Sequence, residues 1–337
     1  MGDVLGKLWG ASPEDVDPGG DASQVFDGPG RIRRARRLSR RGVRAHLEAA
    51  ISRAGPFRPA RRTFALRLFG RFLSGVLDTF GAIRGAPKLS SAEPPTVDRR
   101  TVMFRRDPGI IGPEEQAGTS ARRGKRRDNL LLVVSPPVGG DERSPNVRAL
   151  VAAGLSAGWS VAVHSRDKGS LFDPEALREC VEAARALAGP GALAGVVGLS
   201  AGAHEACKAR LPYPVVSVSN GYDLGEAMRR MHPLARASVA RRIGKMTPVA
   251  SSPEDLSCVR ELLDARAPTL LVNSRNDPLV PDSCVEIGEA IAAEGGHVAS
   301  VTTHRGGHLG FAGRGGKRWA FEVALGFLES AVGDAED

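Results

Sequence analysis

Ser200 is the residue whose surroundings point most directly to chemistry. It lies at the centre of Gly198-Leu199-Ser200-Ala201-Gly202, between an apolar run (194–197) that predicts a strand and an Ala-rich stretch (203–210) that predicts a helix. A serine on a sharp turn from a strand into a helix forms a nucleophile elbow, with its hydroxyl exposed at the end of the sheet. The flanking glycines fit such a turn, because a Cβ would clash where strand and helix pack closely. Ser200 is therefore the predicted nucleophile.

The same five residue types recur at 154–158, where the order of the elements is reversed. There they close a predicted helix (146–157) and precede a predicted strand (160–164). Gly158 fits the glycine that commonly ends a helix. Ser156 is then an ordinary residue of the last helical turn, and we expect no elbow there.

A serine hydroxyl needs a base within hydrogen-bond reach, and the base needs a group that orients it. The predicted acid is Asp277, which follows an apolar strand candidate (269–272), and the predicted base is His308, in a glycine-rich loop after the strand candidate 298–303. The order serine, acid, histidine along the chain is that of the α/β-hydrolases.

Three other residues are alternatives for these roles, and one further histidine is expected away from the site. Asp223 and Asp282 are alternative acids, although Asp282 also fits the N-cap of a helix. His304 is the alternative base, because it lies nearer the end of its strand than His308 does. His297 is expected at the opposite end of that strand, away from the site.

An oxyanion hole needs two N–H donors aimed at the developing negative charge. The amide of Ala201, directly after the nucleophile, is the first predicted donor. The second should come from the loop 135–140, which follows the buried strand candidate 130–134. Pro136 and Pro137 have no N–H, so the sequence favours the Val138 amide.

Strand and helix signals alternate from residue 129 onward, which predicts an α/β protein with a doubly wound, mostly parallel sheet. Active sites in such sheets lie beyond the C-terminal ends of the strands, so the candidate residues should meet at one rim. The predicted strands are 101–104, 130–134, 160–164, 194–197, 214–218, 269–272 and 298–303, and the helices 146–157, 174–188, 203–210, 253–265, 283–294 and 316–330.

Composition, periodicity and the order of the candidate catalytic residues divide the chain into four predicted segments. We expect disorder in 1–30, a basic amphipathic helical extension in 31–84, a linker and edge strand in 85–127, and an α/β-hydrolase domain in 128–332 with a reduced cap at 221–267. Within 61–83, apolar residues recur at three- and four-residue steps with arginines between them. Such a helix either lies in a membrane interface or docks on the domain body.

Charge and cysteine content restrict the partners. The net charge of +9 lies largely before Asp128. Such a basic region either contacts an anionic partner, for which a membrane surface reached through 31–84 is the candidate, or consists only of solvated arginine-rich faces. Aromatic residues make up only 5%, and no nucleic-acid motif is present, so we predict no nucleic-acid partner.

The four cysteines are far apart, which indicates neither a metal site nor a disulfide framework. Reduced cysteines fit a reducing, intracellular location. That location is either cytoplasmic or peripheral to a membrane, and an organelle is also open. No cofactor is predicted.

Five segments in order carry a family resemblance: 144–148, the elbow, 216–224, 276–281 and 306–311. Together they resemble the YheT-like esterases and the eukaryotic abhydrolase-domain 1/2/3 proteins (the AB hydrolase 4 group) over about residues 129 to 330. The resemblance implies a hydrolase of carboxylic, acylglycerol or phospholipid esters, often membrane-associated, with Ser200, Asp277 and His308 as its triad.

The sequence departs from that family at three places. Pro137 stands where such proteins usually carry glycine, 164–167 reads His-Ser-Arg-Asp in place of an Arg-Gly turn, and the cap is short. Two functions are therefore predicted. The first is a serine hydrolase acting on carboxylic esters, above all lipid esters. The alternative is a catalytically impaired binding module that associates with membrane through its basic N-terminus.

Overall fold

The structure is a computed structural model. It describes residues 29–55, 57, 73–76, 78–79, 96–98, 101–104, 129–166, 172–243, 256–294, 296–312 and 318–333. Most of the predicted disordered segment, much of the amphipathic stretch 61–83 and most of the linker lie outside these ranges.

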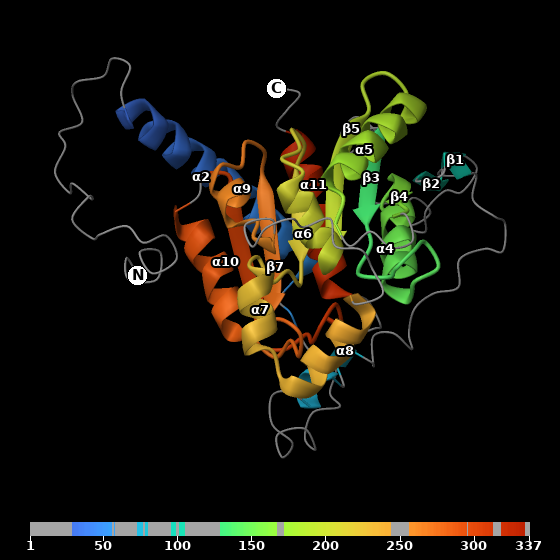
Figure 1. Cartoon of the computed structure of the whole chain (residues 1–337). Helices are drawn as coiled ribbons and strands as arrows, with labels where there is room; N and C mark the ends of the chain where they lie inside the picture. The colour runs from blue at the N-terminus through green and yellow to red at the C-terminus, as the bar shows by residue number, and fades with distance from the viewer. Residues whose placement is uncertain are drawn as a thin grey trace.

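A single sheet of eight strands, in the order β1-β2-β4-β3-β5-β6-β7-β8, forms the centre of the described part (Figure 1). β2 runs antiparallel to both of its neighbours, and the strands from β4 to β8 are parallel, which confirms the predicted mostly parallel sheet. β1 pairs with the outer side of β2, so β1 is the edge strand. The strands are β1 Thr96–Asp98, β2 Thr101–Phe104, β3 Leu130–Ser135, β4 Ser160–His164, β5 Leu193–Leu199, β6 Val215–Val218, β7 Thr269–Ser274 and β8 Val298–Thr303.

Helices cover both faces of the sheet, because the central strands are apolar on both sides. Leu132 and Val134 of β3 belong to a core shared with α4 and α11, whereas Leu131 and Val133 point to a core shared with α5 and α6. The helices are α2 Pro29–Ala54, α4 Pro145–Ser156, α5 Pro174–Ala188, α6 Ala201–Lys208, α7 Leu224–Arg230, α8 Pro233–Ile243, α9 Val259–Leu263, α10 Asp282–Glu294 and α11 Trp319–Gly333.

The predicted cap region contains α7, α8 and α9. Figure 1 shows α7 and α8 at the end of the sheet to which the strand arrows point. The predicted helix 253–265 is represented by the shorter α9, and residues 251–255 lie outside the described ranges. All four cysteines are buried free thiols. None of the described helices is long and apolar enough to cross a bilayer.

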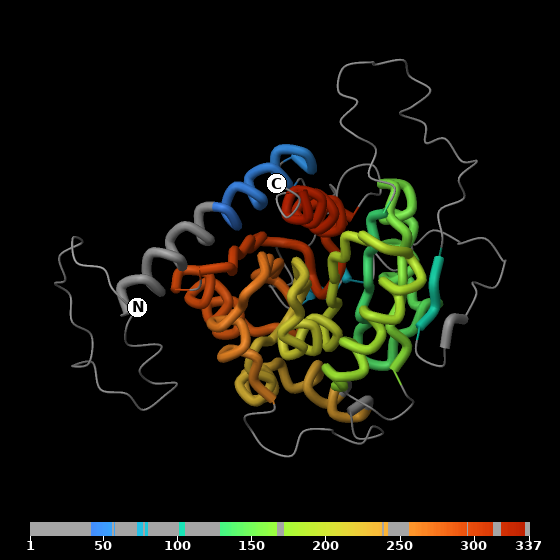
Figure 2. The backbone as a smooth tube through the Cα atoms, turned by 90° about the horizontal axis from the view of Figure 1, so that it is seen from above, coloured from blue at the N-terminus to red at the C-terminus, as the bar shows by residue number. Residues whose placement is uncertain are grey.

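The C-terminal half of α2 is part of the domain body, packed along α11 (Figure 2). Val43 and Ala50 are buried in this contact, and Gly326 of α11 allows the close approach at Ala50. The His46 Nδ1 and the Ser330 hydroxyl are hydrogen-bonded at 3.0 Å, and Arg53 pairs with Glu329. The described end of the predicted basic extension therefore docks on the body.

Candidate active site

Ser200 occupies the turn between β5 and α6 in a strained backbone conformation, with φ 55° and ψ −113°. A non-glycine residue adopts such a positive φ only when the surrounding structure holds it there. A Cβ at Gly198 would overlap the backbone of Ala203, and one at Gly202 would overlap the Ser135 carbonyl oxygen. Ser156, by contrast, is the last residue of α4, and Gly158 follows with φ 92°.

The structure brings the three predicted triad residues together. The His308 Nε2 lies 2.9 Å from the Ser200 Oγ, and the His308 Nδ1 lies 2.9 and 3.1 Å from the two carboxylate oxygens of Asp277. The Asp277 carboxylate is buried and also accepts the N–H groups of Leu279 (2.7 Å) and Val280 (3.0 Å). These bonds fix the carboxylate, which in turn orients the imidazole toward the hydroxyl.

The alternative acids and bases lie elsewhere. Asp223 caps α7, because its carboxylate accepts the Glu226 N–H at 2.8 Å. Asp282 is the first residue of α10, and its carboxylate lies 3.7 Å from the Arg275 Nη1. His304 is exposed to solvent. His297 precedes β8 at the opposite end of the sheet, where burial lowers its pKa. Of the candidate acids and bases, Asp277 and His308 are therefore the pair that lies at Ser200.

The loop that carries Val138 rests on the N-terminus of α6, since a Cβ at Gly202 would overlap the carbonyl oxygens of Ser135 and Pro136. The Pro137 carbonyl accepts hydrogen bonds from the Gly140 N–H (2.9 Å) and the Arg166 Nη1 (3.2 Å). The C=O and N–H of a trans peptide point in opposite directions, so the Val138 N–H points away from Arg166. Within the described residues, neither this N–H nor that of Ala201 has a protein acceptor.

A buried ion pair lies beneath this loop. Arg166 contacts the Glu205 carboxylate through its Nη2 at 2.8 Å and its Nε at 3.0 Å, and Glu205 also accepts the Ser135 hydroxyl and the Asp173 N–H (2.9 Å). Burial by itself would raise the pKa of Glu205, but the charge and hydrogen bonds of Arg166, together with His164 and the Ser135 hydroxyl, outweigh it and hold the pKa below its usual value.

Sequence reasoning missed this pair, although two signals pointed to it. Glu205 is an acidic residue on the inward side of the helix that follows the nucleophile. Arg166 lies in the segment noted above only as a departure from the family pattern. An acidic residue on a buried helix face predicts a cationic partner, because an unpaired buried charge is costly.

Two further residues that sequence reasoning missed connect the loops of the triad. The Asn276 Oδ1 accepts the Gly307 N–H at 2.9 Å and the Ser274 hydroxyl at 2.7 Å. The Ser219 hydroxyl accepts the Leu309 N–H at 3.2 Å. The loops after β6, β7 and β8 are thereby joined directly to one another around His308.

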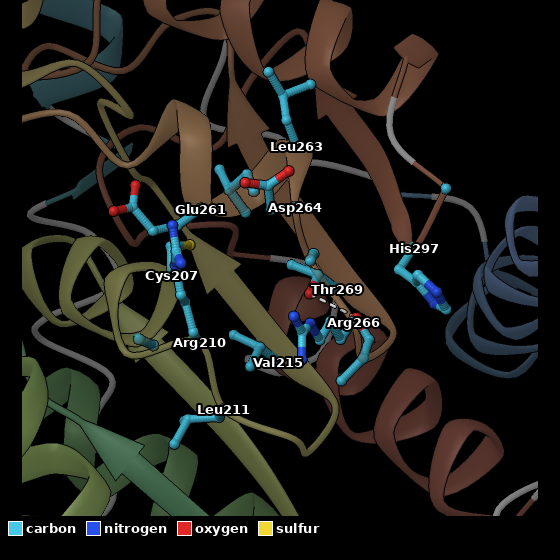
Figure 3. A pocket seen from close by; sticks show the side chains of 15 residues that line it. Cys207, Arg210, Leu211, Val215, Glu261, Leu263, Asp264, Arg266, Thr269 and His297 are labelled. Carbon is cyan, nitrogen blue, oxygen red and sulfur yellow. Dashed lines mark hydrogen bonds between the residues drawn. The ribbon is translucent and has the colours of Figure 1, made fainter. Parts of the chain in front are cut away.

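A cavity of about 750 Å³ lies away from this site, at the amino ends of β6, β7 and β8 (Figure 3). Its lining includes the charged residues Arg210, Glu261, Asp264 and Arg266 together with His297, and none of the triad residues. Within the part of the chain that the structure describes, no group of three or more His, Cys, Asp or Glu side chains could hold a metal ion.

Together, the sheet, the elbow after β5 and the acid and histidine loops after β7 and β8 define the α/β-hydrolase fold. The predicted fold class, an α/β protein with the α/β-hydrolase fold, is thereby confirmed.

Comparison with known proteins finds two curated relatives that carry the same name. No protein-family model matches the chain. The monoacylglycerol lipase ABHD2 of Danio rerio is 43% identical over 58 residues, which are 17% of this chain and 13% of that protein. The similarity therefore spans only a small part of either chain.

Two solved structures with a similar arrangement are named as an esterase and a peptidase. An esterase of Pyrococcus furiosus is 15% identical, with 61% of this chain and 83% of that chain covered and a TM-score of 0.49. An acylaminoacyl peptidase of Pyrococcus horikoshii is also 15% identical, with 60% and 36% covered and a TM-score of 0.46. These likenesses are too distant to indicate a substrate.

Proposed function

We propose that this protein is a serine hydrolase that cleaves carboxylic esters through an acyl-enzyme. The observation that carries the proposal is the position of His308, whose ring lies within hydrogen-bond distance of both the Ser200 hydroxyl and the Asp277 carboxylate. An alcohol, an imidazole and a carboxylate in this order make up the machinery of acyl transfer.

In the first half-reaction, the Ser200 Oγ attacks the acyl carbon while the His308 Nε2 takes the hydroxyl proton. The Asp277 carboxylate stabilises the resulting imidazolium through Nδ1–H. The carbonyl oxygen becomes an oxyanion, which accepts hydrogen bonds from the Val138 and Ala201 amides. The Nε2 then returns the proton to the leaving alcohol.

In the second half-reaction, water attacks the acyl carbon as the His308 Nε2 takes one of its protons. The tetrahedral intermediate collapses, the Ser200 oxygen leaves and regains a proton from the imidazolium, and the carboxylic acid departs. Each proton removed from a nucleophile is thus returned to a leaving group, so the cycle needs no cofactor.

The lining near the elbow supports an apolar acyl group. Phe172, Val138, Ala201 and Leu224 form a small apolar cluster beside the nucleophile. We propose lipid or acylglycerol esters as substrates, a class that also includes the substrate named for the Danio rerio monoacylglycerol lipase. Apolar walls favour such chains by removing them from water.

The contacts of Pro137 support the hydrolase over the impaired binding module. Proline at this position removes no oxyanion donor, because the proposed donor is the amide of the next residue. Its carbonyl is held by Arg166 and the Gly140 N–H, and this arrangement orients the peptide that carries the Val138 N–H. The departure at Pro137 is therefore compatible with turnover.

Association with an anionic membrane surface remains our proposal for the basic stretch 31–41. Its test is flotation of the full chain with vesicles that contain phosphatidylserine, against vesicles of phosphatidylcholine alone. Replacing the arginines of 31–41 by glutamine should abolish the difference. Equal flotation with both vesicle types would refute the proposal.

A fluorophosphonate probe tests the catalytic proposal. The wild-type protein should be labelled, Ser200→Ala should not, and Ser156→Ala is the matched control because Ser156 occupies the same five-residue pattern outside an elbow. Esters of increasing acyl length then report the depth of the acyl site. Labelling that survives in Ser200→Ala, or that never occurs in wild type, would defeat the hydrolase mechanism.

A further inference from the structure

A short helical segment from the N-terminal extension lies against the two loops that carry the acid and the histidine. It consists of residues 73–76 and 78–79, which we call the buttress segment. More than 190 residues separate it in sequence from the loops it contacts. Its apolar spacing fits both a membrane-bound helix and a docked one, and no signal in the sequence indicated which part of the domain body a docked helix would contact.

Its contacts with the Asp277 loop pass through the neighbouring Asn276. The Asn276 amide nitrogen donates to the Asp78 carboxylate at 2.9 Å and to the Ser74 hydroxyl at 3.2 Å. Gly75 is buried against the backbone of the same residue, and a Cβ there would overlap the Asn276 carbonyl oxygen. The segment thus holds this loop through both its side chain and its main chain.

Its contacts with the His308 loop involve the histidine itself. The His308 backbone N–H donates to the Thr79 Oγ1 at 2.8 Å, and the Thr79 hydroxyl donates in turn to the Gly75 carbonyl at 2.7 Å. Arg305, three residues earlier, lies 3.5 Å from the Asp78 carboxylate. A hydrogen bond therefore joins the main chain at position 308 to the buttress segment.

The glycines of the histidine loop make room for the buttress segment. A Cβ at Gly307 would overlap the Gly75 carbonyl oxygen, and one at Gly310 would lie 2.7 Å from the Asp78 carbonyl oxygen. Gly307 also has a positive φ of 61°. The glycine pattern of this loop thus serves close packing against Gly75, Asp78 and Thr79 as well as the turn itself.

We propose that the buttress segment is an integral part of the active site and that Thr79 is a positioning residue for His308. The inference rests on the proposed function, because it assigns Thr79 to the geometry of that triad. The Thr79 hydroxyl fixes the backbone from which the imidazole projects. A misplacement of about 1 Å in a catalytic group can cost roughly 100-fold in rate.

The test compares Thr79→Val, which keeps the branched shape but loses the acceptor, with Thr79→Ser, which restores it. Thr269→Val is the matched control, because Thr269 is a buried threonine whose hydroxyl donates to the Ala267 carbonyl at the opposite end of the sheet. Two measurements are made on the full chain: amide hydrogen exchange in peptides that cover 304–311, and kcat and KM on a short soluble ester.

We expect Thr79→Val to speed exchange in 304–311 and to lower kcat by about 10- to 100-fold with little change in KM. Thr79→Ser should recover most of kcat, and Thr269→Val should change neither measurement. Exchange and kcat equal to wild type in Thr79→Val would overturn the inference. A wild-type protein that hydrolyses no ester would instead refute the proposed function, and hydrogen exchange alone would then decide whether Thr79 holds the loop.

Discussion

The two sides of the candidate active site are held in place by different means. On the oxyanion side, the Val138 loop rests on a buried ion pair between Arg166 and Glu205, and all of its parts come from one stretch of the hydrolase domain. On the histidine side, the loops of Asp277 and His308 are held by a segment from the N-terminal extension, 229 residues before His308 in the case of Thr79.

Because the two sides are held differently, we expect substitutions on each side to change stability and activity in different proportions. Breaking the oxyanion side takes the guanidinium from a fully buried carboxylate, which costs both stability and activity. Breaking the histidine side removes neutral hydrogen bonds, close backbone contacts and contacts of the Asp78 carboxylate, which is partly exposed. Its loss should therefore affect the position of the imidazole more than the free energy of unfolding.

The largest expected effect follows from Arg166→Met, which removes the guanidinium from the buried Glu205 carboxylate. Glu205 then keeps only the Ser135 hydroxyl, the Asp173 N–H and the His164 Nε2 at 3.8 Å as its described partners. We expect a loss of about 3–5 kcal/mol in the free energy of unfolding. The fall in kcat should be about 100-fold, since the Val138 amide loses its orientation. Urea unfolding and ester hydrolysis measure the two quantities.

The double variant Arg166→Met, Glu205→Met separates the two effects of that change. It also removes the buried carboxylate and should recover most of the stability, but it should not recover kcat. Recovery of both would show that the ion pair does not orient the oxyanion loop, and the contrast between the two sides would lose its basis.

A smaller effect is expected from Gly75→Ala on the histidine side. The added Cβ would overlap the Asn276 carbonyl oxygen, so the buttress segment must move away from the loop. Overpacking of this kind costs about 1–3 kcal/mol, and we expect kcat to fall by about 10-fold or more as the loop shifts. Thermal unfolding and ester hydrolysis provide the measurements.

Gly42→Ala in α2 is the matched control, because a Cβ at Gly42 has no neighbour within 4 Å. It should leave kcat unchanged and raise stability by up to about 1 kcal/mol, since alanine favours a helix over glycine. Unchanged activity in Gly75→Ala would indicate that the catalytic loop does not depend on the buttress segment.

The smallest expected effect is on the pH dependence of the free energy of unfolding, to which the buried Glu205 carboxylate of the oxyanion side contributes. The pKa of Glu205 is lower in the folded protein than in the unfolded chain, so its stabilising effect is complete above the unfolded value of about 4.3 and is lost as the pH falls through the folded value. In that acid range the unfolded state binds the extra proton. Stability should therefore rise with pH there, by at most about 1.4 kcal/mol per pH unit for this one group.

Glu205→Gln removes this titration and should flatten the acid side of the curve of stability against pH. Gly75→Ala should lower the whole curve with little change in its slope, because the overlap it introduces does not depend on protonation. Equal slopes for wild type and Glu205→Gln would contradict the assignment of the acid sensitivity to the ion pair.

Much of the fold and part of the candidate site could be predicted from sequence. The apolar runs at β3 and β5 identified buried parallel strands, because such strands are covered on both faces. The glycines around Ser200 indicated a close turn, and the order of serine, acid and histidine brought Asp277 and His308 forward as candidates. These signals are local, since periodicity and turn chemistry act within a few residues.

The partners that hold the site could not be predicted in the same way. Glu205 and Arg166 are 39 residues apart, and Thr79 and His308 are 229 apart, so neither pair leaves a periodic or local trace in the sequence. The amphipathic spacing of 61–83 determined that one face of a helix is apolar. Only the tertiary structure decided that residues 73–76 and 78–79 of this stretch meet the histidine loop, because that choice depends on complementary surfaces that the folded chain alone brings into contact.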